Sequence, residues 1–176
     1  MMLRFYLSTM AVAGISACLA GCGSSEFGTD SIKGILEGAP VNLTNEQVIL
    51  TSKQVDCGAQ NELWDPPANN IARLTQKGRD LKFSDDVRVD DPEVRIPFSQ
   101  LTGSFNVSVS DVSKLRDTDN GMKLADVKLG VVIAHDCFTA PLPLMGIKKG
   151  KFSADAPVVF RFENNGKDWT LDKLIH

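Results

Sequence analysis

The side chains with the widest range of possible chemistry in this 176-residue chain are four cysteines and two histidines. His135 and Cys137 are two residues apart in an apolar run, so on a strand their side chains would share one face. Such a pair could act as a general base with a nucleophile, or as two ligands of a metal ion. A tetrahedral metal site needs further ligands, and the other histidine is His176. The interpretation that we favour makes His135 a hydrogen-bonded packing residue.

The sequence has none of the linear signatures that usually accompany catalysis. It contains no Gly-x-Ser-x-Gly, His-Glu-x-x-His, Cys-x-x-Cys or phosphate-binding loop. We therefore predict a non-enzymatic protein without metal or cofactor, and keep a small envelope hydrolase or metal-dependent enzyme using His135 as the alternative. Lys and Arg number 19 against 22 Asp and Glu, a formal net charge of −3, so nucleic acid is not predicted as a partner.

The beginning of the chain has the layout of a secretory signal. One basic residue, Arg4, precedes sixteen uncharged and mostly apolar residues from Phe5 to Ala20, fewer than the ~20 that a membrane-spanning helix needs. The run ends in Leu19-Ala20-Gly21-Cys22, which resembles the lipobox of bacterial secreted lipoproteins. This resemblance implies that residues 1–21 are a signal peptide, that acyl chains modify Cys22, and that this lipid anchor makes the membrane a partner.

The residues after Cys22 predict where the protein lies and how it is attached. Gly23 follows Cys22 where an Asp would stand in some lipoproteins; in a Gram-negative host, the resemblance implies the outer membrane, facing the periplasm. Residues 22–31 are polar and rich in Gly and Ser, so they are predicted to form a flexible tether. The length of the remainder, 32–176, suits a single globular domain.

Two cysteines are left in the predicted mature chain, because Cys18 leaves with the signal peptide and Cys22 carries lipid. An oxidising compartment favours a structural disulfide between the remaining two, Cys57 and Cys137. A redox role is the alternative, but catalytic pairs usually occur as Cys-x-x-Cys. A metal site that joins Cys137 to His135 is a further alternative.

The first predicted element of the domain is a helix over about residues 45–63. Thr44 and Gln47 have the spacing of a capping box, and apolar residues recur at helical spacing from Val48 onward. Pro66 and Pro67 would stop this helix. The alternative is a strand over 47–51, because Val48-Ile49-Leu50 is β-prone.

Beyond Lys82 the apolar residues alternate with polar ones, which is typical of half-buried strands. One long strand is predicted over 127–137, and Asn-Gly pairs at 120–121 and 165–166 predict hairpin turns. The last hairpin, with Gly166, Trp169 and Leu171, resembles the closing hairpin of cystatin-like α+β domains. The predicted fold class is α+β, with an N-terminal helix packed on a mainly antiparallel β-sheet and one disulfide.

The stretch from Phe138 to Ile147 is apolar, uncharged and interrupted by two prolines. As an exposed patch, it could dock an envelope protein or an apolar ligand. The residues of this candidate binding patch are Phe138, Leu142, Leu144 and Met145. The alternative is a loop that covers the end of the core. The function predicted from the sequence is therefore that of a lipid-anchored bacterial envelope lipoprotein, acting as a non-enzymatic binding or accessory module.

Overall fold

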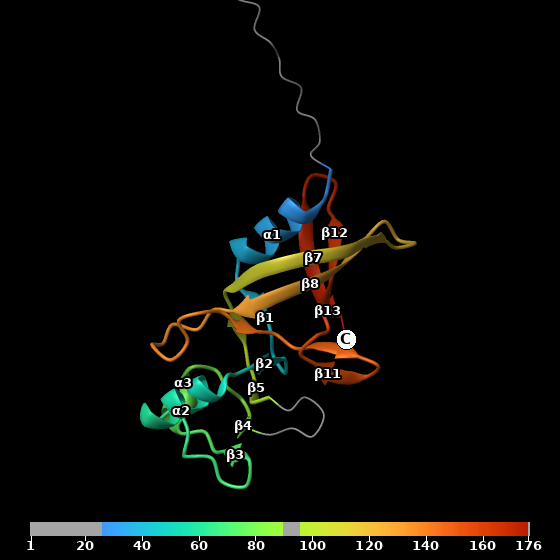
Figure 1. Ribbon diagram of the computed structural model, residues 1–176. Helices are drawn as coiled ribbons and strands as arrows, with labels where there is room; N and C mark the ends of the chain where they lie inside the picture. Colours follow the sequence, from blue (N-terminus) through green and yellow to red (C-terminus); the bar gives the residue numbers. More distant parts are fainter. Residues whose placement is uncertain (1–25, 90–95, 176) are drawn as a thin grey trace, which may run out of the picture.

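The computed structural model describes residues 26–89 and 96–175 (Figure 1). Strand predominates over helix, so the domain is mainly β with three helices among these residues. The helices are α1 (Thr29–Gly38), α2 (Ser52–Gln60) and α3 (Gln76–Asp80). The strands, in chain order, are β1 (Val41–Asn42), β2 (Gln47–Ile49), β3 (Ile71–Ala72), β4 (Val87–Arg88), β5 (Phe98–Gln100), β6 (Ser104–Phe105), β7 (Val107–Asp117), β8 (Lys123–Val131), β9 (Leu142–Pro143), β10 (Gly146–Lys148), β11 (Lys151–Ser153), β12 (Val158–Asn164) and β13 (Trp169–Ile175).

The larger sheet is antiparallel, with strands in the order β13-β12-β8-β7 and with β9 also paired to β8. We call it the large sheet. Its inward side chains alternate as the sequence predicted, since Val158, Phe160 and Phe162 are all buried. Both Asn-Gly turns are confirmed: Gly121 lies between β7 and β8 and Gly166 between β12 and β13, with φ of +72° and +88°. These left-handed backbone angles are ones that glycine adopts without a steric penalty.

Helix α1 lies against the large sheet, next to β7 and β13 (Figure 1). Ile32 and Leu36, four residues apart on one face of the helix, are fully buried. Glu37 accepts a hydrogen bond from the backbone N–H of Val109 at 2.7 Å, so α1 also covers part of the β7 edge. The prediction of a tether over 22–31 is therefore wrong at its end, because α1 begins at Thr29 and Phe27 is already buried. The apolar residues Phe27, Ile32 and Leu36 pack against the large sheet, and this packing stabilises a short helix in a segment that looks polar in the sequence.

A second antiparallel sheet, in the order β2-β5-β4-β3, lies at the other end of the molecule with α2 and α3 (Figure 1). We call this sheet and its two helices the small lobe. The remaining strands form two short two-stranded sheets, β1-β6 and β10-β11. The buried apolar residues of the small lobe and the large sheet form one continuous core, so the two parts fold on each other.

The prediction of a helix over 45–63 is wrong in its extent, and α2 is not the first element of the domain. Residues Gln47–Ile49 form β2 and pair with β5, which is the alternative that the β-prone sequence favoured. Asn45 has a φ of +72°, which a continuous right-handed helix does not allow. The capping box predicted at Thr44 and Gln47 does not form, because Gln47 lies in β2. A different capping box, of Thr51 and Gln54, begins α2 seven residues later. Pairing with a distant strand outweighs helix propensity here.

The predicted strand over 127–137 is also too long, since β8 ends at Val131. After it, the backbone N–H of Val132 donates to the carbonyl of Asn106, and two local bonds, from His135 to Ile133 and from Phe138 to His135, fold the chain into a turn. Alternation therefore does not place His135 and Cys137. Their positions come from this turn, which carries the chain from the large sheet toward the small lobe.

Candidate functional site

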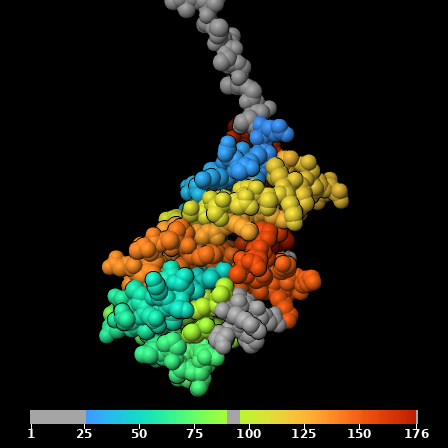
Figure 2. Space-filling view, in the orientation of Figure 1, coloured from blue at the N-terminus to red at the C-terminus, as the bar shows by residue number. Residues whose placement is uncertain are grey.

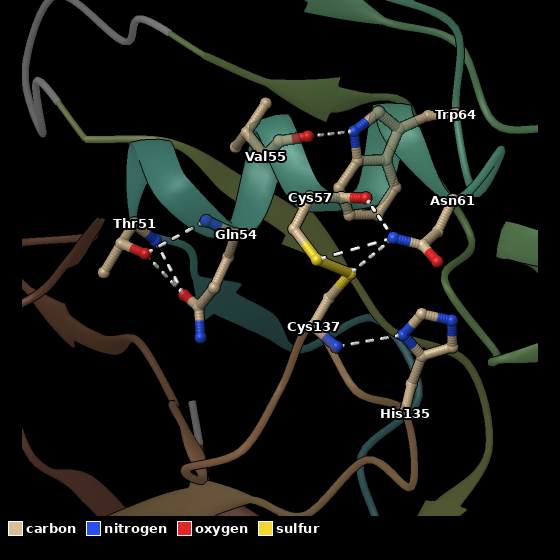
Figure 3. The surroundings of a disulfide bond; sticks show 8 residues. All are labelled: Thr51, Gln54, Val55, Cys57, Asn61, Trp64, His135 and Cys137. Carbon is tan, nitrogen blue, oxygen red and sulfur yellow. Dashed lines mark hydrogen bonds between the residues drawn. A yellow bond between two sulfur atoms is a disulfide. The ribbon is translucent and has the colours of Figure 1, made fainter.

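The predicted disulfide between Cys57 and Cys137 is present, with the two Cα atoms 5.6 Å apart (Figure 3). Cys57 lies in α2 of the small lobe, and Cys137 lies in the turn that follows β8 of the large sheet. Thr51 and Gln54 fix the start of α2, since each accepts a hydrogen bond from the other's backbone N–H. The bridge therefore connects a capped helix of the small lobe to the turn that follows a central strand of the large sheet.

Two polar side chains contact the disulfide region (Figure 3). The amide nitrogen of Asn61 donates to the carbonyl of Cys57 at 2.9 Å and lies 3.6 Å and 3.5 Å from the two sulfur atoms. The Nδ1 atom of His135 accepts a hydrogen bond from the backbone N–H of Cys137 at 3.2 Å. His135 thus has one ring nitrogen committed to the turn, and its neighbouring thiol is oxidised. This arrangement leaves Cys137 without the thiolate that a nucleophile needs.

The disulfide lies close to the buried indole of Trp64 (Figure 3). The indole of Trp64 is 1% exposed and donates through Nε1 to the carbonyl of Val55 at 2.9 Å. A Cβ atom at Gly58 would lie 2.0 Å from the Trp64 ring, so only glycine leaves room for this ring against α2. Trp64 also packs edge-on against Phe83, with ring centroids 5.9 Å apart. Trp64 therefore packs closely against the half of α2 that carries Cys57.

The candidate binding patch is buried, so the prediction of an exposed docking surface there is wrong. Phe138, Leu142, Leu144 and Met145 are between 0% and 5% exposed. Phe138 joins the aromatic cluster of Trp64 and Phe83, and the backbone N–H of Met145 donates to the carbonyl of Gln47. This apolar segment forms the joint between the large sheet and the small lobe, because both surfaces must be removed from water.

The outer surface of the small lobe has two depressions on either side of the segment Asp65-Pro66. One depression, of about 440 Å³, is lined by Trp64, Glu62 and Lys77. The charged groups of Glu62 and Lys77 form an ion pair at 2.6 Å. The hydrogen bond and charge of Lys77 lower the pKa of Glu62. The other, of about 400 Å³, is lined by Ile71 and Arg73 and by the carboxylates of Asp65 and Asp86. Ile71 is 39% exposed, so this depression combines an apolar surface with charges of both signs.

Glu46 is a buried carboxyl group that the sequence did not single out, because it lay inside the predicted helix. It is 3% exposed, and burial raises its pKa to about 7. It borders a cavity of about 110 Å³ between β10 and β12, next to Met145 and Pro157. No pattern of neighbouring residues marks it in the sequence. Its burial results from the hydrogen bonds of the adjacent backbone, including that from the N–H of Leu101 to the carbonyl of Glu46.

The remaining predictions concern the alternative of a metal site and the membrane anchor. Among residues 26–89 and 96–175, no group of three or more His, Cys, Asp or Glu side chains could hold a metal ion. No helix of these residues is both long and apolar enough to span a bilayer. Cys22 and the predicted signal peptide lie outside the described residues.

Searches of protein-family models, of curated proteins and of solved structures find no match to this chain.

Proposed function

We propose that this chain is a lipid-anchored bacterial envelope lipoprotein that acts by non-covalent binding or as an accessory of an envelope assembly. The observation that carries the proposal is the disulfide between Cys57 and Cys137, which fits an oxidising compartment. It supports export, which the sequence ending in Leu19-Ala20-Gly21-Cys22 requires. The acyl chains implied by that sequence would hold the domain at the outer membrane, facing the periplasm, in a Gram-negative host.

The contacts of His135 support a binding role over the hydrolase alternative. Its Nδ1 atom accepts the backbone N–H of Cys137, and the sulfur of Cys137 is bonded to Cys57. The general base and nucleophile considered for this pair are thus both engaged in holding the turn. The small lobe offers a more suitable binding surface, since its two depressions are open and carry both apolar and charged groups.

The anchoring part of the proposal is tested on protein made in a bacterial host. Mass spectrometry should find a chain that starts at Cys22 and carries acyl groups, and membrane fractionation should recover it with the outer membrane. The matched control is Cys22→Ser, which should leave residues 1–21 attached and carry no lipid. An intact Met1 with unmodified sulfur in the normal protein would refute the proposal.

The binding part is tested by cross-linking in intact cells with two variants of exposed apolar residues. Ile71→Asp places a charge in the depression beside Asp65, whereas Val132→Asp alters a residue that is 45% exposed but does not line either depression. A partner of the small lobe should be lost with Ile71→Asp and kept with Val132→Asp. Equal recovery with both variants would exclude the depression that contains Ile71.

A further inference from the structure

The folded domain begins very close to the proposed lipid anchor. Phe27 is 5% exposed, and its ring lies 4.4 Å from that of Trp169 and 5.4 Å from that of Phe162, measured between centroids. Helix α1 begins two residues later, at Thr29. The chain is therefore held by the large sheet from Phe27 onward, and only the link between Cys22 and Phe27 is left as a tether.

This link is short compared with the domain. Five residues reach at most ~18 Å when fully extended, and a flexible chain of this length spans about 12 Å root-mean-square. A domain of this size has a radius of gyration of about 15 Å and is thus roughly 40 Å across. For the end farthest from Phe27 to touch the bilayer, Phe27 would have to stand about a domain's width above it. The tether is too short to allow that orientation.

The structure shows which parts occupy the two ends. The start of α1 and the turn between β12 and β13 lie together where the chain enters the domain, and the small lobe lies at the opposite end (Figures 1 and 2). A groove of about 440 Å³ lies between α1 and this hairpin, and it is lined by Ile35 of α1 and by Lys167 and Trp169 of the hairpin. We call this end, residues 27–35 and 164–169, the tether end.

We propose that the tether end is the membrane-facing surface of the protein, lying against the lipid headgroups, and that the small lobe points away from the bilayer. The inference depends on the proposed acylation of Cys22. Exposed groups of both signs, Asp30 and Lys33 on α1 with Lys167 and Asp168 on the hairpin, give this surface no excess positive charge. The short tether therefore holds it in place, and attraction to anionic lipids is not required. The depressions of the small lobe then face the aqueous compartment.

The orientation is tested on the acylated full-length mature protein in phosphatidylcholine vesicles whose headgroups carry a nitroxide, which quenches only nearby fluorophores. A fluorophore is attached to a new cysteine at one of two exposed positions, Lys167→Cys at the tether end or Arg73→Cys in the small lobe. Quenching should be severalfold stronger at position 167 than at position 73. A matched variant with about 20 Gly and Ser residues inserted after Gly23 raises the root-mean-square reach to roughly 27 Å and should reduce this difference.

The outcomes separate the orientation from the anchor. Equal quenching at the two positions, in protein that carries acyl groups and floats with the vesicles, would overturn the orientation and leave the anchor intact. A difference unchanged by the longer tether would also overturn it, since the tether's length is its cause. Protein that carries no acyl group and does not float would overturn the proposed function and the orientation with it.

Discussion

Removal of the disulfide should cost a large share of the stability of this domain. The bridge joins residues that are 80 apart in the chain. In the chain-entropy model, closing a loop of that length lowers the entropy of the unfolded chain by about 15 cal/mol/K, or about 4.5 kcal/mol at 25 °C. Domains of this size are stable by about 5–15 kcal/mol, so the loss is a large share of the total. We expect the variant Cys57→Ala/Cys137→Ala to lose about 2–4.5 kcal/mol of unfolding free energy.

The structure also predicts which part of the domain opens first when the disulfide is removed. Cys137 precedes Phe138, which packs against Trp64 and Phe83 at the joint between the large sheet and the small lobe. Without the bridge, this joint opens more easily, and α2 should lose hydrogen-exchange protection before β8 and β12 do.

Urea unfolding of the oxidised protein and the double variant measures the loss, and reduction of the normal protein by a dithiol is the control, because it breaks the bridge without shortening a side chain. Asn61→Ala, which removes the amide next to both sulfur atoms, should cost only about 0.5–1.5 kcal/mol. If the double variant and the reduced protein both unfold within ~1 kcal/mol of the oxidised protein, with unchanged slopes, the argument from loop closure is refuted.

Three further perturbations test the packing and charge of the core. Gly58→Ala should destabilise the protein by about 1–3 kcal/mol in thermal unfolding, because the new Cβ would lie 2.0 Å from the Trp64 ring. The free energy of unfolding should fall by up to about 3 kcal/mol as the pH rises from about 4.5 to about 7, because the folded protein binds the proton of Glu46 more tightly than the unfolded chain does. Urea unfolding at several pH values measures this dependence, and Glu46→Gln should reduce it. Asp126→Asn should cost about 1–3 kcal/mol in urea, because a buried carboxylate accepts a hydrogen bond from Arg116 at 2.7 Å.

Two of these changes have a matched control variant. Gly34→Ala places a methyl group on α1 where no atom lies within 4 Å, and should stabilise the protein by about 0.4–1 kcal/mol. Asp117→Asn breaks the ion pair between Asp117 and Lys123. The Asp117 side chain is 80% exposed, so this change should cost less than about 1 kcal/mol. Effects of equal size within either pair would contradict the packing and burial arguments. For Glu46→Gln, an unchanged dependence of stability on pH between about 4.5 and about 7 would show that another group controls it.

The local patterns of the sequence were reliable where one short-range interaction decides the outcome. Alternation predicted the inward faces of β7 and β12, and the Asn-Gly pairs predicted both hairpin turns because glycine is needed for positive φ. The pairing of Cys57 with Cys137 followed from counting the cysteines that remain once Cys18 and Cys22 are assigned to the predicted signal peptide and lipid anchor. The disulfide could therefore be predicted. The contacts of Asn61 with its sulfur atoms and of His135 with the backbone of Cys137 could not.

The errors share one physical origin, which is pairing between residues distant in sequence. Gln47–Ile49 has apolar residues that suit a helix or a strand, and hydrogen bonds to β5 make it a strand. Phe138 to Met145 reads as an exposed apolar patch, and the small lobe covers it. The sequence by itself determined the alternating strands, the turns and the cysteine pair, since each depends on residue type and on short spacing or a simple count of cysteines. Only the tertiary structure decided which apolar surfaces are buried and which elements lie beside Phe27, because burial depends on what lies opposite each residue in space.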